Sequence, residues 1–100
     1  MTKIFAHCFL DESQKKYLED NFSVNVHNAN EKILSPKELV SYASGYEGII
    51  SQGNIISNEY IKKNYNILKA ISNVSVGYDN VDIEFATRYN VAILNTPNIL

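Results

Sequence analysis

ILKAISNVSVGYDNVDIEFATRYNVAILN, residues 67–95, is the stretch that decides the fold. An apolar run of β type at 67–72 is followed by a turn that contains a glycine, and a helical spacing begins after Asp82. A second apolar run follows directly at 91–95. Two strands joined by one short helix are expected to lie parallel in the same sheet, with Asp82 capping the helix. The stretch therefore predicts a βαβ unit.

The same alternation of strand and helix extends upstream from this unit. Apolar or alternating runs predict further strands at residues 3–8, 23–27 and 47–51. Helical spacing separates them, with short links. Five strands that alternate with helices predict an α/β domain whose parallel sheet is doubly wound, in the order 2-1-3-4-5, with helices on both faces.

Capping residues place the beginnings of the helices. In the first helix Asp11 and Gln14 have the spacing of a capping box, and Tyr17, Leu18 and Phe22 are expected to form its buried stripe. In the second helix Ser35, Pro36, Glu38 and Gly45 are a cap, a first-turn proline, a capping-box partner and a C-terminal glycine. A third helix is expected after Ser57, with Tyr60, Ile61 and Tyr65 on one side. In the helix after Asp82, the residues expected to face the sheet are Ile83, Phe85, Ala86 and Tyr89.

Composition excludes several classes of protein. The chain has 100 residues, enough for one domain, and a net charge of −2 without a basic block, which argues against binding to nucleic acid or to a membrane surface. No apolar run approaches the length of a membrane span, and the N-terminal residues read as a first strand rather than a signal peptide. The single cysteine, Cys8, forms no intrachain disulfide and no metal-binding spacing. A cytoplasmic location is the default expectation.

Ligands of an open parallel sheet bind beyond the carboxyl ends of its strands. The segment Ser75, Val76 and Gly77 follows the fourth strand, and consecutive amides in such a turn form an anion-binding nest that glycine leaves open to a carboxylate. The loop of Gln52, Gly53 and Asn54 follows the neighbouring strand and can present donors to the same ligand. Local sequence leaves a second interpretation open, in which both loops are simple turns.

Other candidate residues have structural explanations. Asp79 and Asp82 are placed to close a turn and to cap a helix, so acid–base chemistry is not expected of either. His7 and Cys8 are adjacent in a strand and point to opposite faces, so they cannot act as base and nucleophile together; both are expected in the core or at a sheet edge. His27 is expected at the surface. The chain has no dinucleotide-binding glycine motif, no phosphate loop and no nucleophile elbow.

LKAISNVSVGYDNVDIEFATRYNVAILNTPNIL, residues 68–100, resembles the first-domain signature of the D-isomer-specific 2-hydroxyacid dehydrogenases. SVGYDN, residues 75–80, is similar to the branch of glyoxylate/hydroxypyruvate and 2-ketogluconate reductases. The preceding two thirds of the chain agree with that family only in the order of strands and helices. In the family, a flavodoxin-like N-terminal substrate domain packs against an inserted Rossmann cofactor domain, and the final helix of the chain returns to complete the substrate domain.

The resemblance implies a role for both loops. The amides of Val76 and Gly77, after Ser75, would hold the substrate carboxylate, and Ser51, Gln52 and Gly53 would line the same cleft. Branches similar to phosphoglycerate dehydrogenase carry an arginine where this chain has Ser51, which argues against a phosphorylated substrate. The catalytic arginine, acid and histidine of the family lie downstream, so no catalytic residue is expected in this chain. Leu100 falls at the crossover towards the cofactor domain.

Residues 1–100 are therefore expected to form an incomplete N-terminal substrate-binding domain, without the Rossmann domain and the returning helix. The full-length protein is expected to be a homodimeric enzyme that reduces a small 2-keto acid with NAD or NADP, while the 100 residues alone are expected to be inactive and to expose an apolar sheet face. A non-catalytic binding module, similar to the corepressors that use this fold, is the alternative.

Overall fold

A computed structural model describes residues 1–27, 33–52, 54–73 and 80–95. Strands and helices alternate along the whole of this part of the chain, as the sequence predicts. In chain order the elements are β1 (Lys3–His7), α1 (Glu12–Asn21), β2 (Ser23–His27), α2 (Pro36–Ala43), β3 (Gly48–Ser51), α3 (Asn58–Asn64), β4 (Ala70–Asn73), α4 (Ile83–Arg88) and β5 (Ala92–Asn95).

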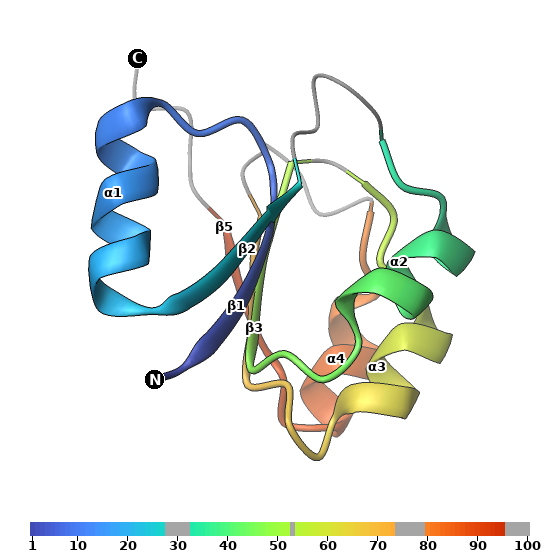
Figure 1. Ribbon diagram of the computed structural model, residues 1–100. Coiled ribbons are helices and arrows are strands. Elements are labelled where there is room, and N and C mark those ends of the chain that lie inside the picture. The colour runs from blue at the N-terminus through green and yellow to red at the C-terminus, as the bar shows by residue number, and fades with distance from the viewer. Residues whose placement is uncertain (28–32, 53, 74–79, 96–100) are drawn as a thin grey trace.

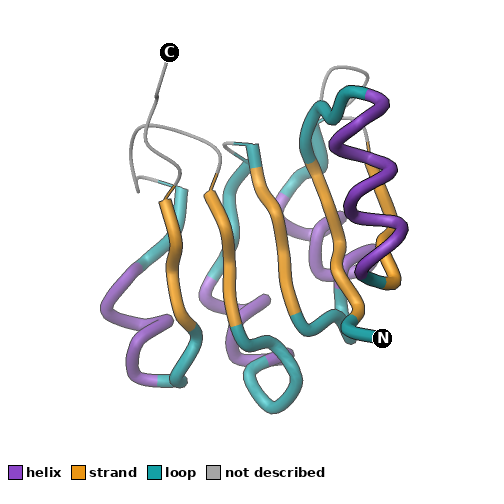
Figure 2. Tube along the Cα trace, turned by 90° about the vertical axis from the view of Figure 1, so that its left-hand side faces the viewer, coloured by secondary structure: helices purple, strands orange, loops and turns teal. Residues whose placement is uncertain are grey.

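The five strands form one parallel sheet in the order β2-β1-β3-β4-β5, which confirms the doubly wound topology. Helices lie on both faces, but unequally. Figure 1 shows α1 alone on one side of the sheet and α2, α3 and α4 together on the other. In Figure 2, α1 lies over the β1 and β2 end of the sheet. The other three helices are therefore the ones that can enclose a large core.

Capping residues mark the start of α1 and both ends of α2, where the sequence predicts them. The Asp11 carboxylate accepts from the Gln14 amide at 2.8 Å, and the Gln14 side chain accepts from the Asp11 amide at 3.0 Å. Ser35 and Glu38 make the same reciprocal pair at the start of α2, with Pro36 in its first turn. Gly45, just past the end of α2, has a φ of +89°, a left-handed conformation that favours glycine. Both capping boxes are confirmed.

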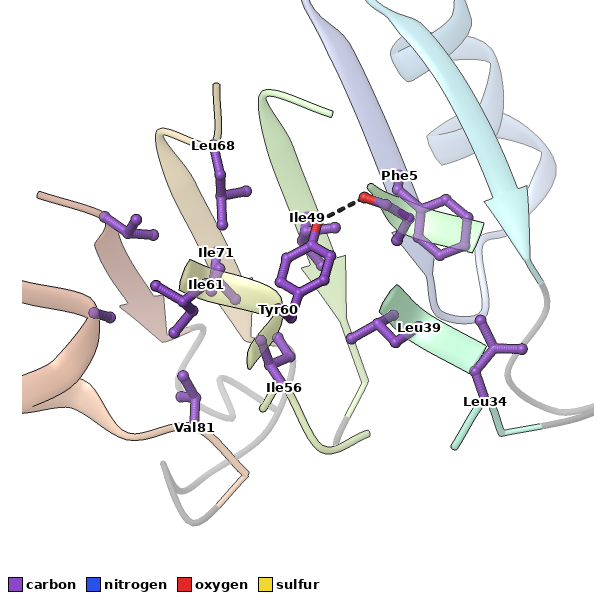
Figure 3. Packing of buried hydrophobic residues seen from close by; sticks show 13 residues of the cluster. Phe5, Leu34, Leu39, Ile49, Ile56, Tyr60, Ile61, Leu68, Ile71 and Val81 are labelled. Carbon is purple, nitrogen blue, oxygen red and sulfur yellow. Dashed lines mark hydrogen bonds between the residues drawn. The ribbon is translucent and has the colours of Figure 1, made fainter. Parts of the chain in front are cut away.

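The hydrophobic core cluster lies between the sheet and α2, α3 and α4 (Figure 3). Phe5, Ile49 and Ile71 point into it from neighbouring strands, and Tyr60 and Ile61 meet them from α3. The Tyr60 hydroxyl is buried and donates to the carbonyl of Ala43 at 2.6 Å, the dashed line in Figure 3. This bond joins the end of α2 to α3 within the apolar layer.

The predicted buried stripe of α1 is wrong for Tyr17. No residue of α1 is buried, and 65% of the Tyr17 surface is exposed. Leu18 and Phe22 are only partly covered. Spacing indicates which side of a helix is apolar, but among the described residues no second helix lies beside α1 to complete the cover. Ile83 was expected to face the sheet, but it is 39% exposed, and Tyr65, predicted on the same side of α3 as Tyr60 and Ile61, is 41% exposed. Ala86, Phe85 and Tyr89 do face the core.

The fourth strand begins three residues later than the pattern predicts. Ile67 and Leu68 donate their amides to the Asn64 carbonyl at 2.9 and 2.7 Å, so these two residues finish the turn after α3. Pairing with β3 begins only at Ala70. Leu68 is nevertheless buried, because its side chain packs into the core cluster just before β4 begins. Its apolar side chain serves the core without belonging to the strand.

The sheet face on the α1 side is uncovered over β3, β4 and β5 in the described part of the chain (Figure 2). Ile50, Ser72 and Leu94 stand in one row across these strands, facing away from the core. Leu94 is 55% exposed, and Ile50 and Ser72 are partly exposed. The described residues therefore leave an open face on this sheet, as the resemblance implies.

Candidate functional site

All five strands end in a polar residue, and these residues form one row across the carboxyl edge of the sheet. In sheet order the row is His27, His7, Ser51, Asn73 and Asn95. Three of its members are fully buried despite being polar: His7, Ser51 and Asn73. Burying a polar side chain costs free energy unless it is hydrogen-bonded. A row of buried polar groups at the edge where such folds bind ligands is a strong indication of a functional edge.

Ser51 and Gln52 lie at this edge, as predicted. The Ser51 hydroxyl donates to the side-chain oxygen of Asn54 inside the protein. The main-chain N–H of Gln52 donates to the His7 carbonyl at 3.0 Å. The side-chain oxygen of Gln52 accepts from the main-chain N–H of Phe9 at 2.8 Å. Gln52 thus holds the segment after β1 against the segment after β3. Its oxygen is occupied by this structural contact.

The remaining predicted site residues lie outside the described part of the chain. They are Gly53, Ser75, Val76, Gly77 and Leu100. The carboxylate nest at Val76 and Gly77 therefore stays a prediction. The structure does place its two ends, because Asn73 closes β4 immediately before residues 74–79 and Asn80 follows them.

Three asparagines that the sequence analysis did not connect tie these loops together. Asn73 and Asn80 exchange a reciprocal pair of side-chain hydrogen bonds, at 2.7 and 3.0 Å. The Asn80 side chain also donates to the carbonyl of Asn54 at 3.0 Å. The sequence does show the three residues near the ends of two neighbouring strands. Asn54 lies just beyond β3, Asn73 ends β4, and Asn80 follows Asn73 by seven residues. Carboxamides carry both donors and acceptors, which suits them to such a network.

His7 is held in its neutral form. Burial lowers the pKa of its imidazole, and the nearby His27 ring lowers it further. His7 Nε2 accepts from the Leu34 amide at 2.9 Å, so the proton resides on Nδ1, which has no partner among the described residues. With none of its surface exposed, His7 is not placed to exchange protons with a ligand. His27 was expected at the surface, but it is half-buried against His7 and Phe5.

Other titratable groups also have structural roles. Cys8 is buried, and burial raises the pKa of its thiol to about 11, so it is not a ready nucleophile. Asp82 caps α4 by accepting from the Phe85 amide at 3.1 Å, as predicted. Asp79 lies outside the described residues. Where the chain is described, His, Cys, Asp and Glu side chains form no group of three that could bind a metal ion. No helix of that part is long and apolar enough to cross a bilayer.

Comparison with known proteins gives the family. The model of the D-isomer specific 2-hydroxyacid dehydrogenase catalytic domain matches residues 4–100. The chain belongs to this family. A crystal structure described as a D-isomer specific 2-hydroxyacid dehydrogenase, NAD-binding, from Polaromonas sp. JS6 66 superposes with a TM-score of 0.91 at 29% identity, over 100% of this chain and 31% of that one.

Two of the curated relatives that match this chain are named as reductases. Glyoxylate reductase of Pyrococcus horikoshii is 31% identical over 98 residues, which are 98% of this chain and 29% of that protein. Glyoxylate/hydroxypyruvate reductase B of Yersinia enterocolitica is 34% identical over 83 residues, 83% of this chain and 25% of that protein. This chain therefore spans less than a third of the length of the dehydrogenases it matches.

Proposed function

We propose that this chain supplies the substrate-carboxylate half of the active site of an NAD(P)-dependent D-2-hydroxyacid dehydrogenase. The substrate would be a small 2-keto acid of the glyoxylate, hydroxypyruvate or 2-ketogluconate type. Family membership over residues 4–100 and the printed names of the curated relatives support this proposal. Residues 1–100 would then be the N-terminal substrate domain of a longer protein with a Rossmann domain and a returning helix.

The observation that carries the proposal is the adjacency of the two candidate loops. Ser51 and Asn73 are register partners at the ends of β3 and β4, so the residues that follow them start side by side. One of these segments contains Gln52 and Gly53, and the other contains Ser75, Val76 and Gly77. Main-chain amides from the second segment would bind the carboxylate, with the first segment lining the cleft. No cation from a side chain is needed for that contact.

The environment of Ser51 favours an unphosphorylated substrate. Its side chain is fully buried, and its hydroxyl donates a hydrogen bond to the Asn54 side-chain oxygen. This position therefore presents neither a positive charge nor an exposed donor to a ligand. A phosphorylated substrate would bring at least one further negative charge, for which bidentate arginine is the usual partner. A small acid without a phosphate group fits such an edge better.

The chemistry would be shared with residues beyond this chain. A reduced nicotinamide, when bound, supplies the hydride for the substrate carbonyl. The chain has no dinucleotide-binding glycine motif, so its own residues do not fit the cofactor's pyrophosphate; any contact would be peripheral, near Leu100. A histidine, an arginine and an acid from outside the chain would supply the proton and polarise the carbonyl. This chain's part is to bind and orient the acid.

Three further properties are proposed for the full-length protein. The description of the Polaromonas protein as NAD-binding favours NAD over NADP. The full-length protein is proposed to be a homodimer, and its location cytoplasmic, on the resemblance to the family and on a composition that suits neither a membrane nor nucleic acid. Size-exclusion chromatography with light scattering, and activity with each cofactor, would test the first two properties on the full-length protein.

Binding of a small dicarboxylate tests the proposal directly. Oxalate, a stable analogue of a 2-keto acid, is titrated into the ¹⁵N-labelled chain while the amide resonances are followed by NMR. We expect shifts concentrated at Val76, Gly77 and the Gln52–Gly53 loop. Oxamide, which has the same shape without the charge, is the control and should leave these resonances unchanged. A folded chain whose loop amides do not respond to oxalate would contradict the proposal and favour a non-catalytic binding module.

A further inference from the structure

We infer that Asn80 is a positioning residue that fixes the two substrate loops relative to each other. The inference deepens the proposed function and rests on it. Asn80 lies outside the predicted binding residues, and its side chain contacts the base of each loop. It would act on the substrate only through the loops that it joins.

The pair of Asn73 and Asn80 joins the two residues that flank the segment 74–79. Asn73 Nδ2 donates to Asn80 Oδ1 at 2.7 Å, and Asn80 Nδ2 donates back to Asn73 Oδ1 at 3.0 Å. Two reciprocal bonds between planar carboxamides fix both the separation and the relative orientation of the two residues. Because one residue precedes and the other follows residues 74–79, the pair fixes both ends of the segment that contains Val76 and Gly77.

The second N–H of the same side-chain nitrogen reaches the other loop. Asn80 Nδ2 donates to the Asn54 carbonyl at 3.0 Å, so it joins the segment after β3 to the base of the 74–79 segment. The main chain reinforces this contact, because the Ile56 amide donates to the Asn80 carbonyl at 2.9 Å and Ile56 forms a parallel bridge with Val81. The bases of both loops are therefore held at one point.

The residue type matters at this position. Asn80 uses two donors and one acceptor on a short side chain, a set that aspartate lacks because an ionised carboxylate only accepts hydrogen bonds. Its partners Asn73 and Asn54 are 0% and 2% exposed, so water does not readily replace a missing bond. Aspartate would also place a negative charge beside the Asn54 carbonyl and the Asn73 side-chain oxygen.

A matched control exists at the opposite end of the sheet. Asn64 is also buried and also joins two segments: its side chain accepts from the Gly45 amide at 2.9 Å and donates to the Tyr60 carbonyl at 2.9 Å. It lies before β4 rather than after it. Loss of Asn64 should therefore lower stability as much as loss of Asn80, without any effect on the carboxylate loops.

The experiment compares Asn80→Asp, Asn80→Ala and Asn64→Asp in the same oxalate titration, at a temperature where circular dichroism shows each variant to be folded. We expect both Asn80 variants to bind oxalate about tenfold more weakly or worse, since small misplacements of binding groups have large effects. Asn64→Asp should bind like the wild type even if it unfolds at a lower temperature. In the full-length enzyme, Asn80→Ala should raise KM for the 2-keto acid and leave KM for the cofactor unchanged.

The outcomes separate this inference from the proposed function. Wild-type affinity in a folded Asn80 variant would overturn the inference and leave the proposed function standing. Equal losses in the Asn64 and Asn80 variants would also overturn it, because the effect would then follow stability alone. If the wild type shows no oxalate response at these amides, the proposed function and the inference fail together. Should Asn80→Ala not fold, Asn80→Ser, which keeps a small polar side chain, takes its place.

Discussion

The imidazole rings of His7 and His27 lie 5.1 Å apart, centroid to centroid, at the ends of two paired strands. His7 is completely buried, and its pKa lies below the ordinary value of 6.5 because of burial first and of His27 second. The unfolded chain therefore binds a proton more readily than the folded chain as the pH falls below 6.5. The contribution of His7 to stability is complete above that pH and is lost as the pH decreases through the folded pKa.

We expect the free energy of unfolding to fall between about pH 7 and pH 5, by at most about 1.4 kcal/mol per pH unit from this one group. His7→Gln keeps an acceptor for the Leu34 amide and removes the titration, so its pH dependence should be flatter over that range. Urea unfolding at several pH values measures both curves. Parallel curves for the two proteins would show that His7 does not titrate differently on folding.

Removal of the Tyr60 hydroxyl should destabilise the domain. Tyr60→Phe leaves the Ala43 carbonyl buried without its 2.6 Å donor, which costs about 1–3 kcal/mol. Tyr42→Phe is the control, because Tyr42 is 56% exposed and should change stability little. Chemical denaturation of the two variants measures the difference. Similar stabilities would mean that the carbonyl finds another donor.

Gly48 is a site of close packing between β1 and β3. A Cβ at this position would lie 2.8 Å from Ile4 Cδ1, so Gly48→Ala forces that methyl group to move. We expect a cost of about 1 kcal/mol, typical of mild overpacking. Ile4→Val removes the obstructing methyl group, and Gly48→Ala should cost less in that background. A double-mutant cycle measures the coupling, and strictly additive effects would show that the two positions do not interact.

The open sheet face should make the isolated 100-residue chain self-associate. Leu94 is 55% exposed on this face, and apolar strands without cover favour association. Sedimentation velocity over a range of concentrations should show dimers or larger species, and Leu94→Lys should reduce them. Ile55→Lys changes a side chain of similar exposure, 56%, in the segment between β3 and α3, and should have little effect. A monomer at every concentration would contradict the prediction.

Local chemistry explains which parts of the fold could be read from the sequence. The capping boxes at Asp11 and Ser35 involve residues three positions apart, so their patterns are visible in the sequence, and both formed as predicted. The strand order followed from the alternation of strands and helices and from the handedness of their connections. Tyr17 was misjudged because its exposure depends on what faces α1, which spacing along one helix does not encode.

The candidate site was only partly predictable for a similar reason. Ser51 and Gln52 could be placed at the carboxyl edge because strand ends are predictable from the sequence. The contact between Asn54 and Asn80 joins residues 26 positions apart, and nothing in either local sequence indicates the other. The asparagine network needs the register of β3 and β4 as well as their order, and that register appears only in the structure.

The unequal distribution of helices has a consequence for hydrogen exchange. α1 contributes no residue to the core, whereas α3 buries Tyr60 and Ile61 within it. Detachment of α1 would expose little apolar surface, so this helix can open in a local fluctuation while the rest of the domain stays folded. In deuterated water its amides should exchange well before those of α3, which must await global unfolding. The first helix of the chain is therefore expected to be its least protected one.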